Sequence, residues 1–376
     1  MSESDESGDP RDLMRSIIQR IATGPELSKD ISYEEARTAM KAVLRNEVDP
    51  VQAAVFLIAL RMKRESDDET KGVLQAIREE TQRVEAPIDE LLDIADPYDG
   101  FNRHLLVSPF LPAVLASCGV ATISHGVRMM GPKYGATHSQ VLLAAGIAVN
   151  QSSQIIAKNL VDVDIGWGYI DQSLSCPALY QLSSLRHQIV KRPVITTVEV
   201  LTGPIVARGK THIMTGYVHK PYPRIYALLA RHAGFSSALL VRGVEGSVTP
   251  SLKQKGKIWF YHDAGEETFL DLDPQELGIE QTVRAVPLPQ NLPGYRKRNA
   301  DAGEKVDAQA MAEAAAQAGM NALDGVTGPA FDALVYAGAL ALFHLKREAS
   351  LADGARRIRQ VLSSGKARSH FLAARQ

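Results

Sequence analysis

Apolar residues recur every three to four positions along the first part of the chain, as they do on one face of an amphipathic helix. Residues 32–35, Ser-Tyr-Glu-Glu, have the sequence of a capping box, which marks a helix start. We therefore predict four helices with short connections, forming a small bundle, over residues 12–22, 33–44, 51–63 and 67–84. The third helix is apolar on nearly every side, so it must be buried or lie at a subunit interface, and we favour the interface because so small a bundle can hardly bury it.

From Leu91 onward, short apolar runs alternate with helical patterns, which is typical of a sheet covered by helices. Strands are expected over residues 91–95, 120–123, 147–149, 211–218 and 237–242, with a hairpin over 257–262 and 268–271. Helices are expected over residues 106–119, from 138 or 139 onward, and over 152–160, 177–190, 223–233, 307–319, 329–346 and 351–363. The predicted fold class is α/β, with an N-terminal helical bundle domain followed by an α/β sheet domain.

Composition sets the domain boundaries and the broad class. Residues 1–10 are acidic and polar and are expected to be a disordered tail. The helical domain is predicted over residues 11–85, with part of 150–192 packing on it, and the α/β domain over 86–376. The net charge of −1 argues against a strongly basic nucleic-acid protein. No apolar run reaches membrane-spanning length, and two cysteines in apolar surroundings give no disulfide framework, so a cytoplasmic protein is expected.

Residues 119–143 carry the main candidate for chemistry. A strand-like run ends on Ser124-His125-Gly126-Val127-Arg128, and a glycine-rich loop with Lys133 then leads to a helix start. Free backbone N–H groups and positive charge collect at such a place, which favours binding of an anion. An ordinary strand-to-helix turn, whose glycines only satisfy backbone geometry, is the alternative.

The chain resembles the anthranilate phosphoribosyltransferase family, also called glycosyltransferase family 3, from end to end after the tail. The resemblance rests on residues 33–66 (YEEARTAMKAVLRNEVDPVQAAVFLIALRMKRES), 116–128 (ASCGVATISHGVR), 239–246 (LLVRGVEG) and 328–367 (GPAFDALVYAGALALFHLKREASLADGARRIRQVLSSGKA). It implies a nucleoside phosphorylase/phosphoribosyltransferase-like fold, a homodimer formed through the N-terminal helices, and a small phosphorylated ligand in the interdomain cleft. It also implies transfer of a phosphoribosyl group from phosphoribosyl pyrophosphate, with Mg²⁺, to an aromatic amine or base.

Site residues follow from the same resemblance. The donor or phosphate group is expected to meet Asp99, Gly100, Arg103, His125, Gly126, Arg128, Lys133 and Gly135. Arg186 stands where the family places an arginine that meets the carboxylate of the acceptor, which suits the bidentate geometry of a guanidinium group. A helix-surface arginine is the alternative interpretation for Arg186. No catalytic side chain or metal ligand is assigned.

Two segments depart from the family pattern. The Gly-Thr-Gly-Gly-Asp loop after the first strand is replaced by residues 95–103, Ala-Asp-Pro-Tyr-Asp-Gly-Phe-Asn-Arg. Val248 and Thr249 stand where the family has the Asp-Glu pair that holds magnesium, and valine offers no oxygen ligand. Glu245, Asp96 or Asp99 are the candidate substitutes.

These departures keep a second hypothesis open, namely a non-catalytic, sequence-independent nucleic-acid-binding protein on the same dimeric fold. A divergent branch of the family is similar in this respect. We expect several cations to converge on one cleft, which would suit either a phosphate ligand or a nucleic-acid backbone: Arg103, Arg128, Lys133, Arg186, Lys191, Arg192, His219, Lys220 and Arg242. The basic run 296–298 gives weak further support. Trp167 is expected to fill the domain junction rather than to stack on an acceptor ring.

Overall fold

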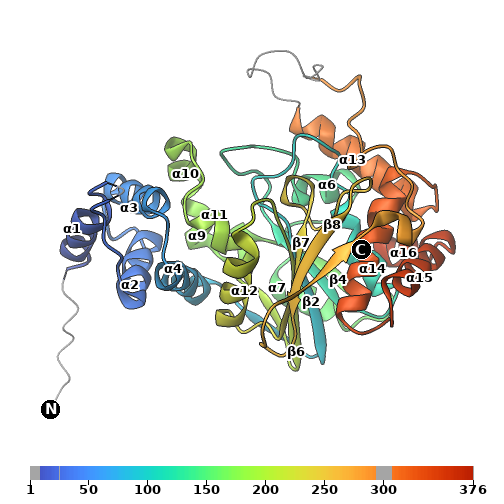
Figure 1. The fold of residues 1–376 in the computed structure, drawn as a ribbon, viewed down its shortest axis with the longest axis horizontal. Helices are drawn as coiled ribbons and strands as arrows, with labels where there is room; N and C mark the ends of the chain where they lie inside the picture. The colour runs from blue at the N-terminus through green and yellow to red at the C-terminus, as the bar shows by residue number, and fades with distance from the viewer. Residues whose placement is uncertain (1–8, 25, 294–306, 376) are drawn as a thin grey trace.

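The computed structural model describes residues 9–24, 26–293 and 307–375, so residues 1–8 of the tail predicted over 1–10 and the basic run 296–298 lie outside the described residues. Residues 9 and 10 are not part of a tail, because Asp9 caps the first helix and Pro10 begins it. Four helices at the N-terminal end form a bundle beside a larger α/β domain (Figure 1). They are α1 (Pro10–Ile21), α2 (Tyr33–Leu44), α3 (Pro50–Lys63) and α4 (Asp67–Glu80). This arrangement confirms the predicted combination of a helical bundle and an α/β domain.

Local sequence explains where the helices of the bundle begin. Ser32 and Ser66 each close a capping box with the glutamate three residues later, and Asp49 caps α3 ahead of Pro50. Gly72 in α4 lets α2 come close, because a Cβ atom there would lie 2.4 Å from the carbonyl oxygen of Tyr33. Val51 and Met62 at the two ends of α3 are exposed. The expected subunit interface on this helix stays a prediction.

The α/β domain is built on a seven-stranded sheet of order β4-β3-β2-β6-β7-β8-β9, in which the first five strands are parallel and the last two pairings antiparallel. A separate parallel pair, β1 and β5, lies beside it. The strands are β1 (Val84–Ala86), β2 (Glu90–Ala95), β3 (Thr122–Gly126), β4 (Trp167–Asp171), β5 (Ile205–Ala207), β6 (Lys210–Tyr217), β7 (Ser237–Arg242), β8 (Gly256–Tyr261) and β9 (Thr268–Leu272).

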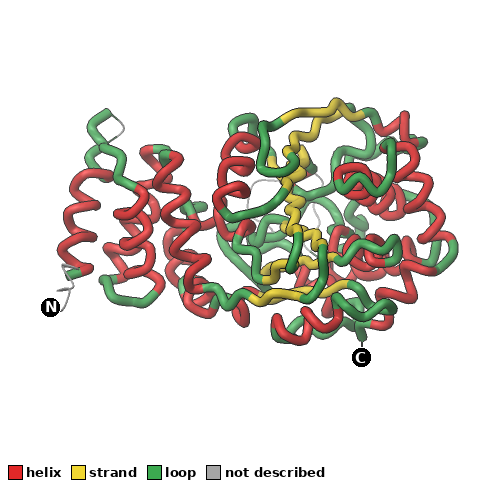
Figure 2. Tube along the Cα trace, turned by 90° about the horizontal axis from the view of Figure 1, so that it is seen from below, coloured by secondary structure: helices red, strands yellow, loops and turns green. Residues whose placement is uncertain are grey.

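Helices cover both faces of the sheet (Figures 1 and 2). Leu92 and Ile94 of β2 point into the larger core with the C-terminal helices, whereas Leu91 points to the opposite face. The helices that follow the bundle are α5 (Leu111–Ala116), α6 (His138–Ala144), α7 (Ser153–Asn159), α8 (Gln172–Ser175), α9 (Pro177–Gln181), α10 (Ser183–Ile189), α11 (Ile195–Val198), α12 (Tyr222–His232), α13 (Ala308–Leu323), α14 (Pro329–His344), α15 (Leu351–Ser363) and α16 (Lys366–Ala373). Of these, α10 contacts α3, and α9 and α11 contact α4. Short 3₁₀ turns lie at 108–110, 199–201, 244–246 and 274–277.

Some expectations are wrong. Residues 147–149 form no strand, and the strands β1, β4 and β5 and the helix α16 were not predicted. Trp167 does not fill the domain junction, because it lies inside the α/β domain, where its indole donates a hydrogen bond to the carbonyl of His370 (2.9 Å) and its ring stacks on Phe371. In the described part of the chain, no helix is long and apolar enough to cross a membrane.

The packing of α13 against the 3₁₀ turn that precedes α5 depends on Gly319. A Cβ atom at this position would lie 2.0 Å from the ring of Phe110, and that ring is fully buried and stacked on Phe371. Gly319→Ala is therefore expected to lower the free energy of unfolding by roughly 1–3 kcal/mol, although alanine is the better helix former. Chemical denaturation measures the change. Gly256→Ala is the matched control and is expected to change stability by less than about 0.5 kcal/mol, because nothing lies within 4 Å of its added methyl group; equal effects would contradict the packing argument.

A buried histidine makes folding sensitive to acid. His344 lies at the end of α14, and its Nε2 is 2.7 Å from the hydroxyl of Ser237, whose hydroxyl also meets His212. Burial, and then the nearby His262 and His212, hold the pKa of His344 well below its usual value of 6.5. Below about pH 6.5 the unfolded chain therefore binds a proton at His344, whereas the folded chain keeps this residue neutral. The free energy of unfolding then falls as the pH drops, by up to about 1.4 kcal/mol per pH unit.

Denaturation midpoints measured between pH 7.5 and 4.5 test this slope. His344→Gln removes the titrating group and should flatten the loss of stability at acid pH, while His219→Gln, at an exposed position, should leave it unchanged. An unaltered slope in the His344 variant would show that another group governs the acid sensitivity.

Candidate functional site

The carboxyl ends of the parallel strands β3, β2, β6 and β7 meet at one edge of the sheet, where open α/β sheets bind their ligands. The loop after β2 and the loop after β3 are joined there by a bridge between Phe101 and Ala136 and by a hydrogen bond from the amide of Gly135 to the carbonyl of Asp99 (2.9 Å). A Cβ atom on Gly100 would lie 2.4 Å from the carbonyl oxygen of Gly135. Both glycines therefore serve the packing of the two loops.

Asp96 connects three chain segments at this edge of the sheet. Its buried carboxylate accepts hydrogen bonds from the hydroxyl of Ser108 (2.5 Å), from Nε2 of His138 (2.8 Å) and from the amide of Val248 (2.8 Å). These partners come from the segment before α5, from the start of α6 and from the loop after β7. A single carboxylate thus fixes the relative positions of the segments that follow β2, β3 and β7.

A second carboxylate, that of Glu245, contacts three residues at this edge, namely Arg103, His104 and Lys133. Its Oε2 accepts from the backbone amide of Arg103 (2.9 Å) and from Nδ1 of His104 (3.1 Å), and its Oε1 lies 3.0 Å from Nζ of Lys133. The Glu245 side chain is only 7% exposed. Burial alone raises the pKa of Glu245, but the hydrogen bond from His104 and the charge of Lys133 outweigh it and lower the pKa to about 2.

Lys133, predicted to hold the donor, is therefore brought to the site but already has an anionic partner. Its ammonium group also lies 5.0 Å from the centre of the Phe101 ring, a cation–π arrangement. His104 was not predicted, because no motif marks it. Only the three-dimensional contact with Glu245 identifies it.

His125 lies at the carboxyl end of β3 but faces the interior. It is 2% exposed, its Nε2 is 2.9 Å from Oδ1 of Asp93, and its Nδ1 forms a short contact with the hydroxyl of Tyr98. A Cβ atom added to Gly126, the next residue, would lie 3.4 Å from the hydroxyl of Tyr169. The expected ligand contact of His125 stays a prediction, and in this structure the ring belongs to a buried polar network.

The remaining predicted cations divide into exposed and paired side chains. Arg103 and Arg128 are exposed, and neither side chain has an ion-pair partner among the described residues; the same holds for Arg242, Lys191 and Lys220. Asp99, by contrast, is buried and accepts from Arg192 (2.8 and 2.5 Å). The structure thus brings Arg103 and Lys133 to the Glu245 carboxylate and places Arg192 on Asp99.

Arg186 lies away from this cluster, in α10. It is 1% exposed and forms a bidentate ion pair with Glu199, with distances of 2.7 and 2.8 Å. The interpretation of Arg186 as a helix-surface residue is wrong, because its side chain is buried. Its guanidinium group already holds a carboxylate of the protein in the geometry that an acceptor carboxylate would take.

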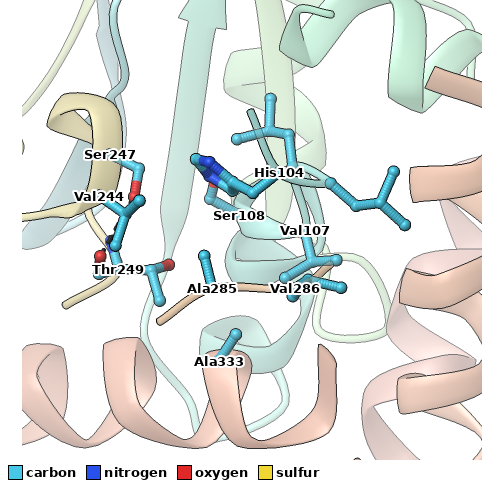
Figure 3. Close-up of a pocket in the computed structure, with 11 residues that line it drawn as sticks. His104, Val107, Ser108, Val244, Ser247, Thr249, Ala285, Val286 and Ala333 are labelled. Carbon is cyan, nitrogen blue, oxygen red and sulfur yellow. Dashed lines mark hydrogen bonds between the residues drawn. The ribbon is translucent and has the colours of Figure 1, made fainter. Parts of the chain in front are cut away.

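A small pocket lies beside the Glu245 turn (Figure 3). His104 and Ser108 line one side, Val244, Ser247 and Thr249 the other, and Ala333 of α14 lies below them. Its volume of about 10 Å³ has room for roughly one water molecule and not for a phosphate group.

The carboxylates here do not fit a magnesium ion. Val248 is fully buried and contributes only its amide, to Asp96, and Glu245, Asp96 and Asp99 are each held by protein donors. Among the described residues, no group of three or more His, Cys, Asp and Glu side chains is placed to hold a metal ion. A hard cation needs several free oxygen ligands, so we assign no chemical step to a metal held by this chain.

Comparison with known proteins gives two family matches. The helical bundle domain of a glycosyl transferase family matches residues 15–81, and its α/β domain matches residues 99–292. Anthranilate phosphoribosyltransferase of Nitrosomonas europaea is 27% identical over 361 residues, covering 96% of each chain. That of Xanthomonas campestris is 26% identical over 342 residues, covering 91% of each.

Solved structures share the fold over nearly the whole chain. Anthranilate phosphoribosyltransferase from Thermus thermophilus superposes with a TM-score of 0.72 at 20% identity, and the enzyme from Saccharomyces cerevisiae in complex with PRPP and Mg superposes with a TM-score of 0.74 at 17% identity. Each alignment covers 97% of this chain and 98% of the other.

The buried Arg186–Glu199 pair gives a test of whether Arg186 is structural. Arg186→Met leaves Glu199 buried without a partner and is expected to lower stability by about 3–5 kcal/mol, as measured by chemical denaturation. Replacing both residues by methionine removes the stranded charge and should recover most of that loss. A single variant as stable as the wild type would contradict the assigned role and would leave Arg186 free for an acceptor.

Proposed function

Because the chain belongs to the glycosyl transferase family with a helical bundle and an α/β domain, we propose that it binds phosphoribosyl pyrophosphate and transfers the phosphoribosyl group to an aromatic amine or base. The relatives named above are anthranilate phosphoribosyltransferases, which agrees with the predicted glycosyltransferase-type enzyme. The donor would lie at the carboxyl edge of the sheet, over the loops that follow β2, β3 and β7.

One observation carries this proposal: donors from the loops after β2 and β3 already hold an anion, which the turn after β7 supplies. The amide of Arg103, the imidazole of His104 and the ammonium group of Lys133 all point at one carboxylate. A backbone N–H, a ring N–H and a lysine are also the donors that hold phosphate oxygens in proteins. The edge of the sheet is therefore suited to an oxyanion ligand in both charge and donor geometry.

Catalysis in this proposal is electrostatic. The ribosyl carbon gains positive charge as its bond to pyrophosphate breaks, and cations at the loop tips stabilise the departing pyrophosphate. Arg103 and Arg128 are suited to this role because they are exposed and have no ion-pair partner in the described part of the chain. The amine or ring nitrogen of the acceptor attacks the same carbon, so no nucleophile from the protein is required.

The alternative is binding of nucleic acid without sequence preference. It is favoured by the exposure of Arg103, Arg128, Lys191, Lys220 and Arg242, none of which has an ion-pair partner among the described residues. Neutralisation of backbone phosphates by such cations is the main source of non-specific affinity. The lack of fitting magnesium ligands among the described residues is compatible with this alternative, whereas the contact of Lys133 with Glu245 favours a small phosphate ligand.

Calorimetric titration with phosphoribosyl pyrophosphate, with and without Mg²⁺, tests the proposal. Binding in the micromolar range is expected, and Arg128→Ala should weaken it about tenfold, because a charge-assisted contact to phosphate is worth about 1.4 kcal/mol. Arg356→Ala, on α15, removes an exposed arginine from another part of the domain and should leave the affinity unchanged.

Absence of binding in both conditions would contradict the transferase proposal. Titration with single- and double-stranded oligonucleotides at two salt concentrations then decides the alternative, since affinity that falls steeply with salt indicates contacts to the nucleic-acid backbone.

A further inference from the structure

The three donors around Glu245, called here the cradle, are the backbone amide of Arg103, Nδ1 of His104 and Nζ of Lys133. They come from the loop after β2 and the loop after β3, whereas the carboxylate comes from the turn after β7. The side chains of His104 and Lys133 in the cradle are largely buried, with exposed fractions of 8% and 13%, and the side chain of Glu245 that they hold is 7% exposed. A carboxylate thus fills a preformed oxyanion site.

The turn after β7 is shaped to deliver this side chain. Glu245 has φ +56 and ψ +14, in the left-handed region that few residues other than glycine adopt. Gly243 on one side admits no side chain, because its Cβ atom would lie 1.6 Å from the carbonyl oxygen of Ser247, and Gly246 on the other side has φ +87. A hydrogen bond from the amide of Val248 to the carboxylate of Asp96 also fixes the turn. A non-glycine residue is therefore kept in a costly conformation, which is compensated by the contacts of its carboxylate.

Charge makes this carboxylate a competitor of any anionic ligand. Glu245 is ionised at neutral pH and neutralises Lys133, the cation of the cradle. A phosphate group placed against the same donors would lie within a few ångströms of the carboxylate, where like charges repel strongly in a partly buried site. The two anions therefore cannot occupy the cradle together.

We propose that Glu245 is an internal occupant of a phosphate site, and that a phosphate or pyrophosphate group binds by displacing the Glu245 carboxylate from the cradle. This inference rests on the proposed function, since it concerns the same edge of the sheet, and it adds a residue that limits the affinity for the ligand. Displacement frees the amide of Arg103, the imidazole of His104 and the ammonium group of Lys133 together. The wild-type protein then binds oxyanions more weakly than the cradle alone would.

Inorganic pyrophosphate is the probe that tests this, in calorimetric titrations of the full chain at pH 7.5. Glu245→Gln keeps the size of the side chain and removes its charge, and it should tighten pyrophosphate binding by about tenfold or more. Glu245→Gly also removes the carboxylate and suits the positive φ, so it supplies a folded variant if glutamine is poorly tolerated. Glu276→Gln, an exposed glutamate near α15, controls for the loss of one negative charge and should change nothing.

A second substitution locates the gain in affinity. Lys133→Met in the Glu245→Gln background keeps the length of the side chain without its charge, and it should abolish the tightening. Circular dichroism and melting temperatures confirm that the variants compared are folded.

The outcomes separate this inference from the proposed function. Equal pyrophosphate affinity in wild type and in the folded Glu245 variants, weaker binding in those variants, or a gain that survives Lys133→Met would each overturn the inference. Micromolar binding of phosphoribosyl pyrophosphate by the wild type would still uphold the proposed function in those cases. Conversely, tighter pyrophosphate binding by Glu245→Gln, with no binding of phosphoribosyl pyrophosphate by the wild type, would support the internal occupant and reject the transferase.

Discussion

A buried charge must be matched by a partner of opposite charge or by hydrogen bonds, and this constraint shapes the edge of the sheet described above. Lys133 is paired with Glu245 and Arg186 with Glu199, and Nε2 of His138 lies 2.8 Å from the carboxylate of Asp96. Each pair joins segments that are distant in sequence or separate in the fold. The carboxylates of Asp96 and Glu245 connect the segments that follow β2, β3 and β7, so the shape of the candidate site depends on them.

The same pairs change what the site offers to a ligand. The resemblance led us to expect several cations around a polyanionic donor, with Glu245, Asp96 or Asp99 as candidate substitutes for the missing magnesium ligands. Lys133 and Arg186 instead meet carboxylates of the protein, and Glu245, Asp96 and Asp99 meet its donors. Of the lysines and arginines expected at the cleft, Arg103, Arg128, Lys191, Lys220 and Arg242 are exposed without an ion-pair partner in the described ranges. A ligand that uses the inner donors must therefore compete with the protein itself.

Much of the fold could be predicted from the sequence because its signals are local. The capping boxes at Ser32 and Ser66 indicated helix starts. Short apolar runs between helical patterns predicted β2, β6 and β7. The strand β4 was missed because Gly168 suggests a turn; the glycine is needed there because a Cβ atom would lie 2.5 Å from Ile156 of α7. The strand expected at residues 147–149 was wrong because Ile147 is apolar for another reason. Its side chain is buried in the core, and its backbone pairs with no described strand.

The candidate site was less predictable for a physical reason. Residues such as Lys133 and Glu245 could be singled out by type and position, but their mutual contact joins residues more than one hundred positions apart, which no local pattern records. The pairing of Arg186 with Glu199 was equally invisible, although both residues are close in sequence, because it depends on burial between α10 and the segment after α11.

A crystal structure of the wild-type protein grown with pyrophosphate tests the central claim most directly, namely that the protein's own carboxylate occupies its phosphate site. The account predicts pyrophosphate oxygens within hydrogen-bond distance of the Arg103 amide, His104 and Lys133, with the Glu245 side chain turned away. Pyrophosphate bound elsewhere on the chain, with the contact between Lys133 and Glu245 intact, would contradict it.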